Sequence, residues 1–92
     1  MGASIKFNWV LQIEPPDHLE VDNSYEFTKP HNRIFPMDTP IDLIDLDRNA
    51  IAKIRVTSFT NSHEQTTGDF KVIKIYSDPE KSMLTTYWKE NE

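Results

Sequence analysis

Apolar side chains alternate with polar ones along two stretches of this chain, and no other feature limits the available folds as strongly. Residues 5–13 place an apolar side chain at every second position, and residues 51–59 repeat the pattern from Ala52 to Ser58. In the first stretch these side chains are Ile5, Phe7, Trp9, Leu11 and Ile13. A period of two is that of a β-strand with one buried face. The core is therefore predicted to be built from strands.

Three further stretches complete a set of five predicted strands. Residues 19–29 contain Tyr25 and Phe27 in alternation with polar neighbours, residues 41–46 are mostly aliphatic, and residues 70–76 are rich in β-formers. Asp47–Ala50 is a tight-turn sequence, because Asp and Asn bond their own backbone. The strands that flank this turn are expected to form an antiparallel hairpin.

Two segments read as connections between strands. Residues 30–40 hold Pro30, Pro36 and Pro40, which predicts an irregular link with Ile34 and Phe35 turned inward. Residues 60–69 are polar and predict a loop in which Gly68 takes a positive φ.

The end of the chain changes from strand to helix patterning. Ser77 or Asp78 can cap a helix, and Glu80 completes a Ser-x-x-Glu capping box. The apolar residues that follow have the spacing of one helical stripe: Met83, Leu84, Tyr87 and Trp88. Thr85 and Thr86 are poor helix formers, so a sixth strand is the alternative.

These elements predict a mainly β, single-domain protein over residues 1–92: a small antiparallel, partly open barrel of about five strands with a short C-terminal helix. Every link but one is too short for a parallel crossover, which needs a dozen or more residues. A sandwich of the same strands is the other architecture that fits.

Composition excludes several functional classes. The chain has no cysteine, so disulfides, thiolate catalysis and iron–sulfur clusters are ruled out. Its two glycines cannot form a Walker loop or a dinucleotide fingerprint. No signal peptide and no apolar run of membrane-spanning length are visible, so we expect a cytoplasmic protein with no membrane partner. The net charge of −5 argues against non-specific nucleic-acid binding.

No motif indicates catalysis, a metal or a cofactor. Asp45–Asn49 has the D-x-D-x-N opening of a calcium loop, but Ala50 and Val56 replace the required glycine and glutamate. The three histidines have no zinc-pair spacing, and no Gly-x-Ser-x-Gly elbow is present. We therefore expect a protein that is not an enzyme and carries neither cofactor nor metal.

The stiff, proline-flanked segment 30–36 is the first candidate binding site. Arg33 follows His31 and Asn32, and an arginine can hold a phosphate or carboxylate at two points. The alternative is that Arg33 pairs with one of the many acids of the chain.

Residues 51–77 are locally positive within an acidic protein and supply the second candidate site. Lys53 and Arg55 are predicted to share one strand face, and Lys71 and Lys74 lie on the next strand, against only Glu64 and Asp69. The alternative is an ordinary solvated strand face. Two weaker candidates are the polar loop at residues 63–68 and the aromatic pair Tyr87–Trp88, which fits core packing better.

Several runs of the sequence resemble a short uncharacterised family from Gram-positive bacilli. They are Phe35-Pro36, Pro40–Asp45, Ala50–Ile54, Thr66–Gly68 and Val72–Tyr76. The family has no assigned activity, so the resemblance implies no catalytic or binding residue. More loosely, the strand order resembles PUA-like barrels, including the ASCH group, which implies a pseudo-barrel and RNA or modified-nucleotide ligands. The chain departs from that pattern in lacking a Gly-rich entry and a clear basic face.

The sequence thus favours a non-enzymatic binding or adaptor module that captures a protein or a small anionic ligand. The ligand-binding residues are predicted to be His31, Asn32, Arg33, Lys53 and Arg55. The alternative is a PUA-like RNA- or nucleotide-binding domain, which the acidic net charge disfavours.

Overall fold

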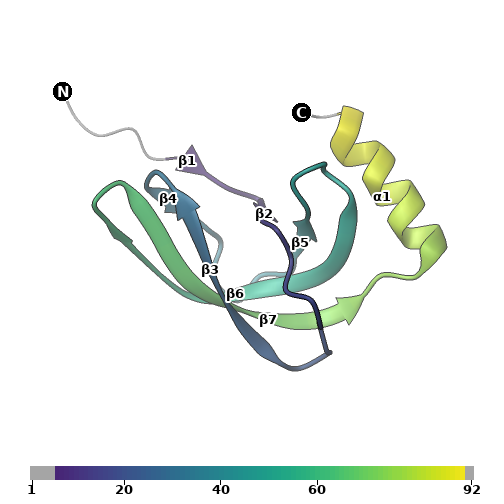
Figure 1. The fold of residues 1–92 in the computed structure, drawn as a ribbon, viewed down its shortest axis with the longest axis horizontal. Coiled ribbons are helices and arrows are strands. Elements are labelled where there is room, and N and C mark those ends of the chain that lie inside the picture. The colour runs from purple at the N-terminus through teal and green to yellow at the C-terminus, as the bar shows by residue number, and fades with distance from the viewer. Residues whose placement is uncertain (1–5, 91–92) are drawn as a thin grey trace.

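A computed structural model describes residues 6–90. The protein is mainly β: a five-stranded mixed sheet curls into an open half-barrel, and one helix follows it (Figure 1). The elements are β1 (Lys6–Phe7), β2 (Val10–Gln12), β3 (Ser24–Pro30), β4 (Arg33–Ile34), β5 (Ile41–Ile44), β6 (Ala50–Ser62), β7 (Gln65–Ile75) and α1 (Asp78–Glu90). The large sheet has the order β2-β5-β6-β7-β3, and β1 pairs with β4 alone. The predicted partly open barrel with a C-terminal helix is confirmed.

Alternate side chains of the central strands point into the concave side of the sheet. Ala52, Ile54 and Val56 are all buried, as the period of two predicts. Ser58 is exposed, because a bulge between Val56 and Ser58 inserts one residue and reverses the alternation. The buried cluster is Leu11, Ile13, Phe27, Phe35, Ile41, Leu43, Ala52, Ile54, Val56, Phe70 and Val72.

Strands β6 and β7 form one long hairpin, so the predicted loop at residues 60–69 is wrong. Pairing continues to Ser62 opposite Gln65, and the turn consists of His63 and Glu64, both with positive φ (56° and 58°). A two-residue turn with positive φ at both positions has a backbone twist that matches the twist of the two strands it joins. The polar residues that suggested a loop belong instead to strand positions, most of which are exposed.

Gly68 does not adopt the predicted positive φ. It lies within β7, opposite Phe27 on β3 and Phe59 on β6. A Cβ at this position would approach the Ser58 carbonyl oxygen to 2.3 Å and the Phe27 ring to 2.9 Å. Glycine is required here by the close approach of its neighbours rather than by a turn.

The N-terminal stretch is not one continuous strand. The chain bends at Trp9, which is 63% exposed, and β2 then runs parallel to β5. Leu11 and Ile13 are buried as predicted, whereas Ile5 lies outside the described residues. The single long link, residues 13–40, permits this parallel pair, and β3 within that link forms the opposite edge of the sheet. The other three neighbouring pairs of the large sheet are antiparallel, and the small β1–β4 pair is parallel.

The proline-rich segment contributes one side chain to the core instead of two. Phe35 is buried and packs edge-on against Phe27 and Phe59, with ring centroids 5.4 and 5.9 Å away. Ile34 lies next to it in β4 and is 37% exposed, so its predicted burial is wrong. Because β4 is extended, neighbouring side chains point in opposite directions.

The C-terminal helix is confirmed, but its buried stripe differs from the predicted one. Glu80 accepts hydrogen bonds from the backbone N–H (2.9 Å) and the hydroxyl (3.0 Å) of Ser77, as a capping box requires. Leu84 and Trp88 are half-buried, whereas Met83 and Tyr87 are exposed. The helix lies alongside the start of β6 at the end away from the β6–β7 turn, so only a narrow side of it is covered (Figure 1). No helix within residues 6–90 has the length and apolar character needed to cross a membrane.

Candidate functional site

The outer face of the sheet, which points away from the core, brings four cations together. Lys53 lies directly opposite Lys74, and Arg55 lies directly opposite Lys71, on the adjacent strands β6 and β7. We call these four residues the basic strip. Like charges placed directly opposite each other destabilise a sheet. Two successive pairs of this kind, in a chain with net charge −5, are a feature that folding alone does not favour.

Most of the basic strip lacks an acidic partner. Lys74 forms an ion pair with Glu80, which projects from the first turn of α1. Within residues 6–90, Lys53, Arg55 and Lys71 form no ion pair with any carboxylate. The strip therefore presents three cations without an ion pair on one face of the sheet.

The carboxylate nearest in register to the strip is already occupied. Asp42 on β5 lies directly opposite Lys53. It accepts hydrogen bonds from the Tyr76 hydroxyl and from the Trp88 indole N–H (2.8 Å). Burial, and then the bond to Asp42, raise the pKa of Tyr76 well above its ordinary value, so the phenol remains a donor. Asp42 thus anchors the C-terminal segment and forms no ion pair with Lys53, although its negative charge stays opposite that lysine.

Arg55 carries a covered hydrogen-bond donor without a partner. Its side chain is half-buried, and its Nε–H is covered and has no acceptor among residues 6–90. A covered donor without an acceptor is unfavourable, and more so in a charged group. Arginine binds carboxylate and phosphate oxygens through paired N–H groups, so an anion is the ligand class that fits this residue.

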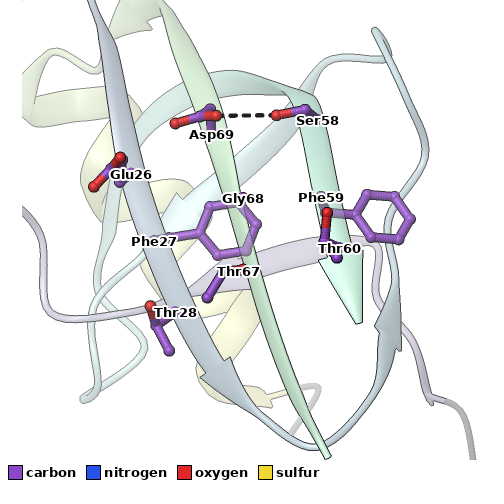
Figure 2. A pocket seen from close by; sticks show the side chains of 9 residues that line it. All are labelled: Glu26, Phe27, Thr28, Ser58, Phe59, Thr60, Thr67, Gly68 and Asp69. Atoms are coloured by element: carbon purple, nitrogen blue, oxygen red, sulfur yellow. Dashed lines mark hydrogen bonds between the residues drawn. The ribbon is translucent and has the colours of Figure 1, made fainter. Parts of the chain in front are cut away.

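A polar depression is lined by side chains of β3, β6 and β7 on the side of the strip toward the β6–β7 turn (Figure 2). It has a volume of about 340 Å³. Glu26 and Asp69 face each other across β3 and β7, and the Ser58 hydroxyl donates to Asp69 (3.0 Å). Figure 2 shows the Phe27 ring lying across Gly68 beneath this depression. The remaining lining side chains are Thr28, Phe59, Thr60 and Thr67.

The depression carries the opposite charge to the strip and bounds it. Asp69 lies two residues before Lys71 on β7, so the two side chains are same-face neighbours. An anion is attracted to the strip and repelled by the two carboxylates. The two carboxylates lie between the strip and the β6–β7 turn.

Arg33 lies on the other side of the hairpin. Its backbone N–H donates to Thr66 Oγ1 (2.9 Å) and Asn61 Oδ1 (3.1 Å), and Thr66 is fully buried on the core side of β7. Its Nε donates to the Pro30 carbonyl (2.8 Å), which ties the guanidinium to its own loop. Burial lowers the pKa of Arg33 from its ordinary value. Within residues 6–90 Arg33 forms no ion pair with an acid, and an anion site at this residue stays a prediction.

The neighbours of Arg33 also serve the loop. His31 has φ 71°, and its N–H donates to the Glu64 carbonyl (2.6 Å) at the hairpin turn. The Asn32 Oδ1 is covered and has no hydrogen-bond partner in the described part of the chain. The five predicted site residues therefore fall into two groups. His31, Asn32 and Arg33 lie on the core side near the hairpin turn, and Lys53 and Arg55 lie on the outer face.

Sequence reasoning included Lys71 and Lys74 in the positive segment but omitted them from the predicted site. The signal that identifies them is register, because each stands opposite a cation of β6. Sequence reasoning gave Glu80 only its role in the capping box and did not place Asp42 or Glu80 near the strip. They reach the strip from β5 and α1, and no spacing in the sequence indicates those contacts.

Fold and surface together define a class: a small β half-barrel of mixed strand direction, with a polar outer face and a C-terminal helix. The X-ray structure of protein ytmB from Bacillus subtilis, a structural genomics target, has a similar fold, with a TM-score of 0.70. The similarity covers 85% of this chain and 98% of that one, at 20% sequence identity, and so concerns the fold alone. It agrees with the resemblance to small proteins of bacilli. By sequence, the chain matches no family model and no curated protein.

Proposed function

We propose that this protein is a non-enzymatic binding module that captures a compact anionic group on the basic strip. The observation that carries the proposal is the two pairs of directly opposed like charges on β6 and β7, in which Lys53, Arg55 and Lys71 form no ion pair within residues 6–90. The unfavourable repulsion among these residues is relieved when an anion is bound.

The dimensions of the strip set the size of the ligand. Neighbouring strands are ~5 Å apart, and same-face residues along a strand are ~7 Å apart. Such a spacing suits two or three charged oxygen atoms of a phosphate or carboxylate group. Cations alone bind and orient an anion, but they supply no nucleophile–base pair, which favours binding over catalysis.

The proposal predicts that removal of the strip cations weakens anion binding. Inorganic tripolyphosphate is titrated into the protein by isothermal calorimetry at low and at moderate salt. For Lys53→Ala and Lys71→Ala we expect a loss of about threefold to tenfold in affinity each, because each removes a charge-assisted contact of ~1 kcal/mol or more. Lys89→Ala, which removes an exposed lysine from the last turn of α1, is the matched control.

Two results would count against this function. One is wild-type protein that binds no tripolyphosphate at low salt. The other is a Lys89→Ala variant that loses as much affinity as Lys53→Ala, because binding would then depend on overall charge and not on the strip.

RNA or nucleotide binding of PUA-like type is the second candidate, and the cationic sheet face is the observation that favours it. Glu26 and Asp69 next to the strip oppose a long phosphate backbone. A short RNA titrated in parallel with tripolyphosphate distinguishes this candidate from the compact-anion site. Log affinity for RNA falls with log salt concentration, and each neutralised phosphate makes that fall steeper by about 0.7. A fall of log affinity with log salt steeper than about 3 for RNA would favour RNA binding.

A further inference from the structure

One carboxylate joins the basic strip to the start of the helix. Glu80 Oε2 forms the ion pair with Lys74, while Oε1 accepts both hydrogen bonds from Ser77. The side chains of Lys74 and Glu80 are 53% and 35% exposed, so the pair is open to competition from dissolved ions. Glu80 is thus a carboxylate of the protein itself, bound to a residue of the proposed anion site.

We infer that Glu80 is a resident counter-ion that competes with the anionic partner for Lys74, so that the first turn of α1 sets the affinity of the basic strip. This inference rests on the proposed function and adds its regulation. A bound anion and the Glu80 carboxylate repel each other and share one lysine. Any partner must therefore either leave Lys74 to Glu80 or displace that contact.

The competition is present at every pH near neutrality. The hydrogen bond from Lys74, followed by that from the Ser77 N–H, lowers the pKa of Glu80 from 4.5 to about 2. The carboxylate is therefore charged throughout the neutral range, and mild acidification does not remove it. By linkage, an anion that weakens the Glu80–Lys74 contact is weakened by that contact to the same degree.

Two other side chains of the C-terminal segment bind a second carboxylate near the strip, Asp42. Tyr76 and Trp88 hold both oxygens of Asp42, which stands opposite Lys53. The C-terminal segment therefore pairs with Lys74 directly and holds the Asp42 carboxylate through neutral donors, so that Lys53 forms no ion pair within residues 6–90. The strip cations that do not contact Glu80 are Lys53, Arg55 and Lys71.

Glu80→Gln tests the inference, because glutamine also serves as the third helical residue of a capping box and removes only the charge. Glu90→Gln is the matched control, because it also removes one negative charge but does so at the exposed last residue of α1. With tripolyphosphate as the probe, we expect Glu80→Gln to bind about twofold to fivefold tighter than wild type, the range of an exposed ion pair. Glu90→Gln is expected to stay close to wild type.

A third variant separates charge from helix stability. Ser77→Ala removes the capping hydroxyl without a change in charge, and we expect its affinity to equal that of wild type. Equal gains for Glu80→Gln and Glu90→Gln, or a gain for Ser77→Ala as large as that for Glu80→Gln, would overturn the inference.

If neither wild type nor Glu80→Gln binds tripolyphosphate, the proposed function itself fails. If wild type binds and Lys53→Ala weakens it, only the inference is at risk.

Discussion

At the scale of single residues, two positions of β7 show how a side chain, or its absence, positions the surrounding chain. Thr66 is fully buried, and its hydroxyl donates to the His31 carbonyl (2.9 Å) and accepts the Arg33 N–H. It fixes the proline-rich segment on the hairpin. Gly68, two residues on, leaves room for the Phe27 ring and for the bulged backbone at Ser58.

Gly68→Ala is predicted to destabilise the protein by about 1–3 kcal/mol, the usual effect of overpacking. The added methyl group would overlap the Ser58 carbonyl oxygen, which is backbone and cannot rotate away. Urea unfolding followed by circular dichroism measures the change. Thr67→Ala, at the exposed neighbouring position, is expected to stay within about 0.5 kcal/mol. An equally stable Gly68→Ala protein would contradict the close packing described above.

At the scale of elements, the helix is attached to the sheet mainly through polar contacts. None of its residues is fully buried. Thr85 accepts the Ala50 N–H (2.9 Å), and Arg48 donates to the Trp88 carbonyl (2.7 Å). The Trp88 indole donates to Asp42. An element held in this way contributes less stability than the core strands, and its contacts are sensitive to charge and pH.

The contribution of Glu80 to stability is predicted to disappear in acid. Its pKa is about 2 in the folded protein and near 4.5 in the unfolded chain, so the unfolded state binds its proton first as the pH falls. The stabilisation is complete above about pH 5 and is lost as the pH falls from about 4.5 to about 2.

The free energy of unfolding of wild type and Glu80→Gln, compared from pH 7 to pH 2, measures this loss. We expect the advantage of wild type to be constant down to about pH 5 and to vanish near pH 2. An advantage that persists unchanged at pH 2 would mean that the Glu80 charge is not its source.

At the scale of the whole molecule, the half-barrel has two open edges, β2 and β3. Lys29 on β3 points into the concave side, and its ammonium group donates to the Gln12 carbonyl oxygen on β2. This contact connects the two edges across the gap that strand pairing leaves open. The half-buried Lys29 thus bridges the two edge strands, and its ammonium group has a hydrogen-bond acceptor in the Gln12 carbonyl oxygen.

Lys29→Ala is therefore predicted to lower the free energy of unfolding by about 1.5–3 kcal/mol, the range for a hydrogen bond to a charged group. Amide exchange in β2 and β3 should accelerate, because the two edges lose their connection. Thr28→Ala, on the outer face of the same strand, provides the control and is expected to have little effect. Unchanged exchange in both edge strands would show that the barrel does not depend on Lys29.

Local patterning determined most of the elements of this protein. The alternation at Ala52, Ile54 and Val56 and the capping box at Ser77 and Glu80 depend on interactions within a few residues, which a sequence displays directly. The same reasoning placed Lys53 and Arg55 on one face. It failed at the Ser58 bulge and at the polar end of the hairpin, where pairing with a distant strand outweighs local preference.

Only the tertiary structure decided which residues meet. The parallel pairing of β2 with β5, the separation of Arg33 from the basic strip, and the contacts of Asp42 and Glu80 all join segments far apart in the chain. Period-two burial says which face of a strand is apolar, but it does not say which strand lies beside it. Strand order and register are set by packing of the whole core, and the charge pattern of the outer face follows from them.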